Sequence, residues 1–566
     1  MNVRSQFQRR VGLPLALMLA VIPSTILAQQ SPAPESSATE MPDSAESEVP
    51  GLEVDQPAPE EALLPATPVF GADSVPRAPR GSNWDVRGQA RFRFNQASDF
   101  ATDDVGTRHG REAWTETRLV LGGFWNPIER MHLEVEIDGL NGQASGDVTT
   151  LGQQIDEDLF RISRYDQQDL RRVYPRKALI QFDTSFARFI VGAQTFGWGT
   201  GMLANDGLSD QDFGDAWRGS LVARIAVLTQ PLRNRSTSAV GRGWTLLAAG
   251  DRVIEDDNAS WYDGDDAWSA ILGTRIDTAR WSVGAFNALR WQTDRPDPLY
   301  PVDRRTTVQV NSVDVYGKWT ITEPGGDHRL QLEGEAALIV GRTDRPWLDE
   351  TFEDGARVQS MGALARLRYD SQAARLTARL DAGYASGDND PRDDVARGFS
   401  FHSDYNVGLI LFDQVMPMLT ARAGDRVFDP DLLAVPPSGV RFTVAQGGVT
   451  NAGYLNPVVR WQPVNGLDAR LGWLYAVAAA ELVDVYQSAL AGGYDTGFGG
   501  VTGGSRVLGN EVNLGLRYTF DFDDSTAVRF GGEGGVFLPG AAFDGVGGED
   551  GLPTLTMWRG TLDVLW

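Results

Sequence analysis

Alternation of apolar and polar residues dominates the sequence from residue 84 to its end. Residues 84–96 read WDVRGQARFRFNQ, in which every second residue is apolar or small and the residues between them are polar and mostly charged. The pattern returns in MHLEVEIDG, WSAILGTRID, MGALARLRYD, LTARLDAGY and VNLGLRYTFD. Because successive side chains of a strand point to opposite faces, it predicts strands with one apolar and one polar face. A soluble sandwich would share this periodicity, so alternation alone does not decide the fold.

Three further features favour a barrel that crosses a membrane. The segments are about 10 to 14 residues long, which suits a tilted transmembrane strand better than a soluble one. Short connections such as NPIER, DTA and PVNG alternate with long ones, as periplasmic turns alternate with external loops. Aromatic residues gather near segment ends, where an interfacial girdle would lie, at Trp125, Trp291, Trp319, Tyr369, Trp461 and Phe520. We therefore predict an all-β fold, a single transmembrane antiparallel β-barrel over residues 84–566.

The strand count follows from the same segments. Candidate strands start near residues 84, 112, 130, 173, 186, 215, 243, 267, 280, 307, 328, 358, 374, 451, 467, 511, 526 and 554, which gives about 18 strands. The long connection 386–450 contains VGLILFDQVMPMLTARA, which is typical of a short helix rather than a strand. A loop this apolar must bury its side chains, so we expect it to fold into the lumen or over the barrel mouth. Its predicted constriction residues are Asp404, Tyr405, Asn406 and Phe412.

The first 83 residues differ from the rest. Residues 1–28 combine arginines with the apolar run VGLPLALMLAVIPSTILA and a plausible cleavage point after Ala28, which predicts an export signal peptide. An uncleaved membrane anchor is the alternative. Residues 29–83 are rich in Pro, Ser, Ala and Glu, so they bury too little apolar surface to fold, and we predict a disordered tether.

The last residues, TLTMWRGTLDVLW, place four large apolar side chains on one face and end on Trp566. This arrangement resembles the C-terminal strand of bacterial outer-membrane proteins, in which a terminal aromatic residue is recognised by the barrel-assembly machinery. The resemblance implies the bacterial outer membrane as the location, with outer-membrane lipid and the barrel-assembly machinery as partners.

The polar strand faces indicate what a lumen would present. An aqueous interior tolerates charged side chains, and guanidinium groups bind carboxylates and phosphates in a planar, forked geometry. The predicted solute path consists of Arg87, Arg91, Arg93, Arg118, Lys177, Arg188, Arg218, Arg224, Arg275, Arg290, Arg366, Arg368, Arg379 and Arg517. Two hypotheses stay open: the cations select anions, or they pair with acids on neighbouring strands and stiffen the wall.

The composition argues against several other kinds of site and partner. The chain has no Cys and only four His, which excludes disulfides and thiolate metal sites, and we expect no cofactor. Its net charge of −25 gives no reason to expect a nucleic-acid partner. Many of the acidic residues lie in the tether and in long loops, and we interpret them first as ordinary solvated side chains. Weak calcium candidates in these loops are Asp388, Asp390 and Asp393.

Two segments resemble known barrels. Residues 187–207, ARFIVGAQTFGWGTGMLANDG, and 213–224, FGDAWRGSLVAR, resemble a strand and loop of porin-like outer-membrane barrels related to the alginate-export family. Gly192, Gln194, Trp198 and Gly199 match, whereas Ala193 stands where that family has Arg. Residues 388–415 resemble a motif of uncharacterised barrels from delta-class bacteria. The resemblance implies an outer-membrane channel, a porin or exporter, for small or polymeric solutes.

Two other classes of function compete with a channel. An outer-membrane phospholipase or protease needs a nucleophile and a His at the rim, and the candidates are His132 beside Glu134, or His402 beside Ser403 and Asp404. Groups adjacent in sequence do not form a catalytic triad, since its members converge from separate elements, so we expect no enzyme. A non-conducting structural or adhesive barrel is the other alternative. The transported molecule, its direction and the oligomeric state stay open.

Overall fold

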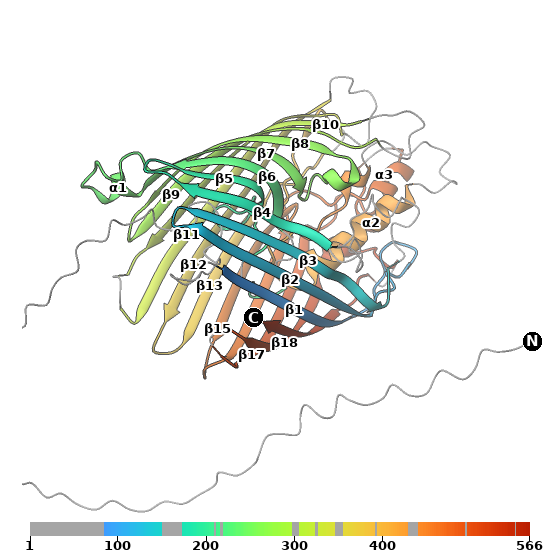
Figure 1. Ribbon diagram of the computed structural model, residues 1–566. Coiled ribbons are helices and arrows are strands. Elements are labelled where there is room, and N and C mark those ends of the chain that lie inside the picture. The colour runs from blue at the N-terminus through green and yellow to red at the C-terminus, as the bar shows by residue number, and fades with distance from the viewer. Residues whose placement is uncertain are drawn as a thin grey trace, which may run out of the picture. The chain divides into compact units, whose positions relative to one another are not determined.

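The computed structural model (Figure 1) describes residues 84–149, 173–208, 211–214, 219–296, 305–322, 326–345, 355–390, 393–427, 440–492, 495–523, 525–548 and 551–566. Within these residues, nineteen strands form one sheet. One of them, β14 (Val395–Ala396), has two residues and pairs in parallel with β12, so eighteen strands form the wall, as predicted. The predicted signal peptide 1–28 and tether 29–83 lie outside the described residues.

The wall strands are antiparallel and 9 to 16 residues long. They are β1 (Trp84–Ala97), β2 (Ala113–Ile128), β3 (Met131–Gly146), β4 (Val173–Asp183), β5 (Arg188–Phe196), β6 (Ser220–Thr229), β7 (Trp244–Glu255), β8 (Asp266–Asp277), β9 (Trp281–Thr293), β10 (Thr307–Thr320), β11 (His328–Thr343), β12 (Ala356–Ser371), β13 (Leu376–Ala385), β15 (Ala452–Trp461), β16 (Leu467–Ala478), β17 (Val507–Asp521), β18 (Ala527–Pro539) and β19 (Leu555–Leu565).

The barrel closes where β1 pairs with β19, from Gln89 opposite Leu565 to Ala97 opposite Met557. At this seam, the N–H of Gly88 donates to the carbonyl of Trp566 at 2.8 Å, and the N–H of Trp566 donates back to the carbonyl of Gly88. A Cβ on Gly88 would lie 2.2 Å from the Trp566 ring. Because Gly88 has no side chain, the ring can lie flat across the seam.

The two faces of the wall differ as the alternation predicts. On β1, Phe92 and Phe94 are 55% and 50% exposed, whereas Arg93 between them is 4% exposed. On β6, Ile225 is 65% exposed and the preceding Arg224 is 5% exposed. Apolar side chains therefore cover the outside, and charged side chains lie on the inner face, which is the arrangement of a transmembrane barrel.

The connections also alternate in length. Short turns such as residues 129–130, 278–280 and 372–375 lie at the end that carries both barrel termini, and longer connections lie at the other end. One connection at the short-turn end, residues 230–243, is longer and contains α1 (Ala239–Gly243). The helices α2 (Met416–Arg426) and α3 (Val485–Leu490) lie at the opposite end from α1 (Figure 1). No helix among the described residues is long and apolar enough to cross a membrane.

One strand begins later than predicted. The segment FGDAWRGSLVAR suggests a strand from about residue 215, but β6 begins at Ser220. Gly214 and Gly219 have φ angles of 74° and 69°, which take the chain out of extended geometry before β6. The N–H of Gly219 donates to the Asp404 carboxylate at 2.6 Å instead of entering the sheet. The predicted lumen residue Arg218 lies outside the described residues.

Candidate functional site

The connection between β5 and β6 crosses the barrel interior. At its start, the Trp198 indole Nε1–H donates to Asp314 on β10 at 2.7 Å, and the backbone N–H and hydroxyl of Thr200 both donate to Glu335 on β11. Asp314 and Glu335 are 0% and 3% exposed. Because β10 and β11 are distant from β5 around the wall, these bonds anchor the connection across the lumen.

The same connection reaches the opposite side of the barrel. Asp212 forms an ion pair with Arg379 on β13 at 2.6 Å, and the N–H of Gly214 donates to Glu533 on β18 at 3.3 Å. The Phe213 ring lies against the wall at Gly472 on β16, where a Cβ would meet it at 2.5 Å. A glycine inside a strand commonly marks such a close approach. We call the described residues of this connection, 197–208, 211–214 and 219, the first inward segment.

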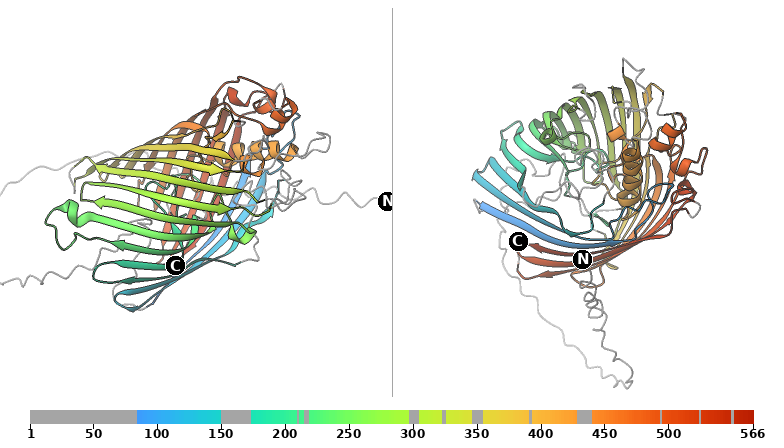
Figure 2. Two further views of the ribbon diagram at one scale, coloured as in Figure 1. Left: turned by 90° about the horizontal axis from the view of Figure 1, so that it is seen from above. Right: turned by 90° about the vertical axis from the view of Figure 1, so that its right-hand side faces the viewer.

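The connection between β13 and β15, predicted over residues 386–450, forms a second inward segment in its described residues. Three of its backbone N–H groups, those of Leu409, Ile410 and Leu411, donate to one buried carboxylate, Glu511 on β17. Tyr405 donates its hydroxyl to Asp381 on β13 at 3.3 Å. Figure 2 (right) looks along the barrel and shows α2 of this segment within the ring of strands.

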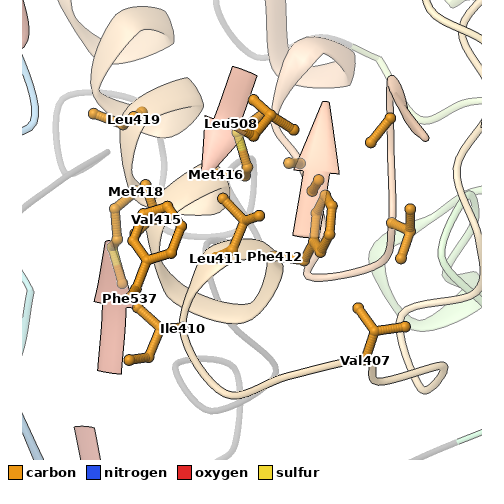
Figure 3. Close-up of a cluster of buried hydrophobic side chains, with 14 of the residues drawn as sticks. Val407, Ile410, Leu411, Phe412, Val415, Met416, Met418, Leu419, Leu508 and Phe537 are labelled. Carbon is orange, nitrogen blue, oxygen red and sulfur yellow. The ribbon is translucent and has the colours of Figure 1, made fainter. Parts of the chain in front are cut away.

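The predicted helix within this segment is confirmed. A π-helical turn, Leu411–Val415, leads into α2. Its apolar side chains pack with the inner face of two wall strands in the cluster of Figure 3, which includes Val407, Ile410, Leu411, Phe412, Val415, Met416, Met418, Leu419, Leu508 and Phe537. The apolar run that alternation could not explain is therefore a small core built inside the barrel.

The predicted constriction residues have mostly anchoring positions. Asp404 and Tyr405 are 0% and 5% exposed, and Phe412 is buried in the apolar cluster of Figure 3. Asn406 lies beside Gly214 of the first inward segment, where a Cβ would be 3.1 Å from its side chain. The two inward segments therefore touch. Asp404 joins them by accepting the Gly219 N–H, whereas Tyr405 and Phe412 hold the second segment through Asp381 and through the apolar cluster, so these three side chains are anchors rather than the lining of an open path.

Most of the predicted solute-path cations are already paired. Within the described residues, twelve of them form an ion pair at 2.5 to 3.3 Å with an acid on the same or a neighbouring strand, or in a nearby loop. The pairs are Arg87 with Asp85, Arg91 with Asp563, Arg93 with Glu116, Arg118 with Asp138, Lys177 with Glu134, Arg188 with Asp183, Arg224 with Asp251, Arg275 with Asp277, Arg290 with Asp256, Arg366 and Arg379 with Asp381, and Arg368 with Asp370.

This pairing bears on the two hypotheses for the cations. A guanidinium that already binds a carboxylate attracts a passing anion only weakly, because the pair has little net charge. Where the two partners lie on neighbouring strands, as in Arg118 with Asp138, the pair also holds these strands in register. The geometry thus favours the wall-stiffening hypothesis over rings of anion-selecting arginines.

The catalytic candidates near His402 do not form a triad. His402 Nε2 lies 3.1 Å from the Ser220 hydroxyl, but Nδ1 accepts the backbone N–H of Asp404 at 3.0 Å. The Nδ1 atom therefore carries no proton, and the neutral ring carries its proton on Nε2 and donates to Ser220. A general base must accept the Ser proton at Nε2 while Nδ1–H donates to a carboxylate, so this arrangement is reversed. Ser403 instead donates its hydroxyl to Asp257 at 2.7 Å.

Two of the three weak calcium candidates, Asp388 and Asp393, bind an arginine. The Arg397 guanidinium lies 2.7 Å from Asp393 and 3.5 Å from Asp388. A cationic side chain thus takes the position that the calcium hypothesis gave to a metal ion. Among the described residues, no group of three or more acidic or His side chains is arranged to hold a metal.

A cavity of about 500 Å³ lies between the inner face of β6–β12 and the second inward segment. Its walls combine apolar strand residues with carboxylates and guanidinium groups near the long loops, among them Asp256, Asp257, Arg290 and Arg345. A volume of roughly 300 to 1,000 Å³ is usual for small-molecule sites. The cavity is therefore large enough for one small solute.

Two ion pairs fix the polar end of this cavity. Arg290 binds Asp256 at 2.6 Å, and Arg345 Nε donates to Asp294 at 2.7 Å. Burial acts to raise the pKa of both carboxyl groups, but the paired guanidinium and further hydrogen bonds outweigh it and hold each pKa below its usual range. Both carboxylates are therefore ionised at neutral pH.

The sequence reasoning missed the first inward segment as a constriction. Trp198, Gly199, Phe213 and Gly214 entered the sequence analysis only through a resemblance, and Asp212 did not enter it. The available signal was the density of glycines in GWGTGMLANDG, because glycines let a backbone lie close to other elements. Gly199 has a φ of 58°, and a Cβ there would lie 2.2 Å from the Glu335 carboxylate.

No protein-family model matches the chain, and no curated protein matches it significantly. Among solved structures, the chain is similar to OccAB2 of Acinetobacter baumannii, with 11% identity and a TM-score of 0.46 over 86% of this chain and 98% of that one. It is also similar to OccK8 (OprE) of Pseudomonas aeruginosa, with 8% identity and a TM-score of 0.45 over 86% and 98% of the two chains. The outer membrane protein OpdK of Pseudomonas aeruginosa shows 10% identity and a TM-score of 0.43 over 85% and 99%. Each is a distant likeness in fold.

Proposed function

We propose that this chain is an outer-membrane channel that passes small solutes through a narrowed, water-filled lumen. The observation that carries the proposal is the closed wall itself, whose largely charged inner face encloses two inward segments and a cavity that they leave open. An apolar exterior suits hydrocarbon, and a charged interior suits water. A barrel whose role was purely structural would have no need of a charged inner face beside an open cavity.

The width of the path favours small solutes over polymers. The first inward segment is bonded to strands on both sides of the lumen, through Asp314, Glu335 and Arg379. A polymer would require these bonds to break, whereas a small solute can pass beside them. We also propose that the chain shares an ancestor with barrels of the alginate-export family, because Gly192, Gln194, Trp198 and Gly199 match residues of that family. The proposed function includes no catalytic reaction.

The membrane partners follow from the same proposal. The exposed apolar strand face is the surface that outer-membrane lipid would cover. The C-terminal strand β19 ends beside Trp566, whose ring lies over Gly88 at the seam. We propose that this strand is the one that the barrel-assembly machinery recognises before β1 and β19 pair.

Planar-bilayer recordings of the full-length protein test the channel. We expect discrete conductance steps and a reversal potential near zero in a KCl gradient, because most of the predicted lumen cations are paired with carboxylates. Correctly folded protein that inserts but conducts no current would replace the channel with a structural or adhesive barrel. A strong anion preference would restore the hypothesis of arginine rings.

A further inference from the structure

The cavity described above has an apolar wall where the rest of the inner face is charged. Its strand residues include Ile271 on β8, Ala288 on β9, Val310 on β10, Ile339 on β11 and Val358 on β12. Successive side chains alternate, so Val310 lies on the same face as Asp314, which bonds to the first inward segment. Five adjacent strands therefore present small apolar side chains to the lumen.

Aromatic side chains complete the apolar part of the cavity. Phe399 and Phe401 of the second inward segment are 2% and 1% exposed, and they contact each other edge to face with ring centroids 6.0 Å apart. Phe442 also lines the cavity. Apolar surface that faces water costs free energy in proportion to its area, so this wall favours a solute with an apolar body.

The polar end of the cavity has more acid than base. Five carboxylates line it, Asp251, Asp256, Asp257, Asp263 and Asp265, against three arginines, Arg290, Arg295 and Arg345. Two of these groups pair with residues outside the lining, Asp251 with Arg224 and Arg345 with Asp294. One of these partners is basic and the other acidic, so the excess of two acids is unchanged. The end is therefore negative overall.

Asp257 carries this negative charge most clearly. Its two oxygens accept the backbone N–H and the hydroxyl of Ser403, both at 2.7 Å, and both donors are neutral. Asp265 likewise accepts backbone N–H groups, from Ser260 and Arg295. Neutral donors orient a carboxylate and leave its charge in place, so Asp257 can still attract a cation.

The nearby arginines are poor partners for an anionic solute. All three side-chain nitrogens of Arg290 donate, Nε to Gln292 and the other two to Asp256. The Arg345 guanidinium binds Asp294 and lies 3.9 Å over the Phe442 ring. A carboxylate solute would have to displace these acids and would also meet Asp257.

We propose that this cavity binds amphipathic organic cations, that is, small solutes with an aromatic-sized apolar body and a protonated amine. The body would lie on the apolar wall around Val310 and Ala288, and the ammonium group would bind near Asp257. This inference names the substrate class of the proposed channel and rests on that proposal only for the route by which the solute travels.

Isothermal titration calorimetry on the full-length protein in detergent tests the proposal without a membrane current. The probes are 2-phenylethylammonium, 2-phenylethanol and 3-phenylpropionate, which share a body and differ in the charge of the head. We expect the ammonium compound to bind about tenfold tighter than the alcohol, since a favourable charge contact adds about that factor. We expect the carboxylate to bind weakest.

Two variants and a control locate the binding. Asp257→Asn keeps the side-chain shape, and it should weaken the ammonium compound about fivefold while leaving the alcohol unchanged. Val310→Ser should weaken the ammonium compound and the alcohol alike, by about fivefold. Asp183→Asn removes a wall carboxylate at the short-turn end, outside the cavity lining, and should change neither affinity.

Equal or tighter binding of the carboxylate overturns the inference, as does ammonium binding that Asp257→Asn leaves unaffected. Failure of the channel proposal has a different signature. Ammonium-selective binding together with no bilayer conductance would contradict the channel and support the binding site. Conductance with no ammonium preference would support the channel and contradict the binding site.

Discussion

Two sectors of the inner wall contrast in chemistry although the strands that build them look alike. On β1–β4, with β19 beside them, inward side chains are charged and paired, as in Arg93 with Glu116 and Arg118 with Asp138. On β8–β12, the inward side chains near the long loops are small and apolar, as in Val310 and Ile339. We refer to these as the charge-paired sector and the apolar sector.

The difference shows that the polarity of the inner face matches the polarity of the groups that it contacts. Charged side chains on the charge-paired sector satisfy one another across the sheet, which fixes strand register without any partner from the lumen. The apolar sector meets aromatic side chains of the inward segments, because Trp198 contacts Phe286 and Tyr316 with ring centroids 5.2 and 6.3 Å apart. Strand alternation therefore predicts which face of a strand points into the barrel. It does not predict whether the side chains on that face pair with neighbouring strands or contact a ligand.

The largest effect should come from breaking a buried pair in the charge-paired sector. Glu116→Ala leaves Arg93, which is 4% exposed, without its carboxylate, so we expect a loss of about 3 to 5 kcal/mol of unfolding free energy. Urea unfolding in lipid vesicles, followed by tryptophan fluorescence, measures it. The double variant Arg93→Met with Glu116→Leu should recover most of the loss, and a double variant as unstable as the single one would show that the pair does not act as a unit.

A smaller effect is expected where the second inward segment is held. Glu511→Ala removes the acceptor for three buried N–H groups, and we expect the segment to dock about 2 to 3 kcal/mol more weakly. Limited proteolysis between residues 400 and 427 and single-channel noise should both increase. Glu511→Gln retains an acceptor oxygen, so its rate of proteolysis and its channel noise should lie between those of Glu511→Ala and those of the wild type. Unchanged proteolysis would show that the apolar cluster of Figure 3 alone holds the segment.

The close approach of the first inward segment can be tested by filling it. Gly472→Val would place side-chain atoms against Phe213, and we expect a cost of about 1 to 2 kcal/mol and a changed conductance as the segment shifts. Gly123→Val is a matched control, because a Cβ there meets no atom within 4 Å. Equal conductance in the two variants would contradict the position of Phe213 against the wall.

The smallest effect should appear at the polar rim of the apolar sector and only in acid. Asp294 has a lowered pKa, so its pairing with Arg345 stabilises the folded state above the pKa of the unfolded carboxyl and is lost as the pH falls through the folded value. The difference in Tm between wild type and Asp294→Asn should stay constant from pH 7 to about pH 5 and shrink below about pH 4. A difference that grows on acidification would contradict the direction of the shift.

The wall was predictable because its period is local. A one-residue slip would turn every apolar side chain to the wrong face, so strand positions follow from the alternation. Most predicted strands begin within two residues of their observed starts. β17 begins earlier, at Val507 rather than near residue 511, because Gly509 with a φ of 129° introduces an irregularity opposite Ala476 and Val477 and masks the alternation.

The lumen contents were harder to predict because they depend on contacts between distant residues. The helix in VGLILFDQVMPMLTARA was predictable from its own sequence, whereas its attachment to Glu511 joins groups about 100 positions apart. The partners of the arginines were equally hidden, since alternation places Arg91 on the inner face without showing that Asp563 lies beside it across the seam. Trp198 and Asp212 carry no local pattern that marks them as anchors.

Thiol labelling of single-cysteine variants tests the central claim most directly, since the chain contains no native Cys. Val310→Cys replaces a side chain of the apolar sector that faces the lumen, and Val313→Cys replaces one on the lipid-facing side of the same strand. In vesicles, a charged, membrane-impermeant thiol reagent should label Val310→Cys quickly, 2-phenylethylammonium should slow that labelling, and Val313→Cys should resist the reagent. Labelling of Val313→Cys as fast as Val310→Cys would contradict a closed barrel with an aqueous, solute-binding interior.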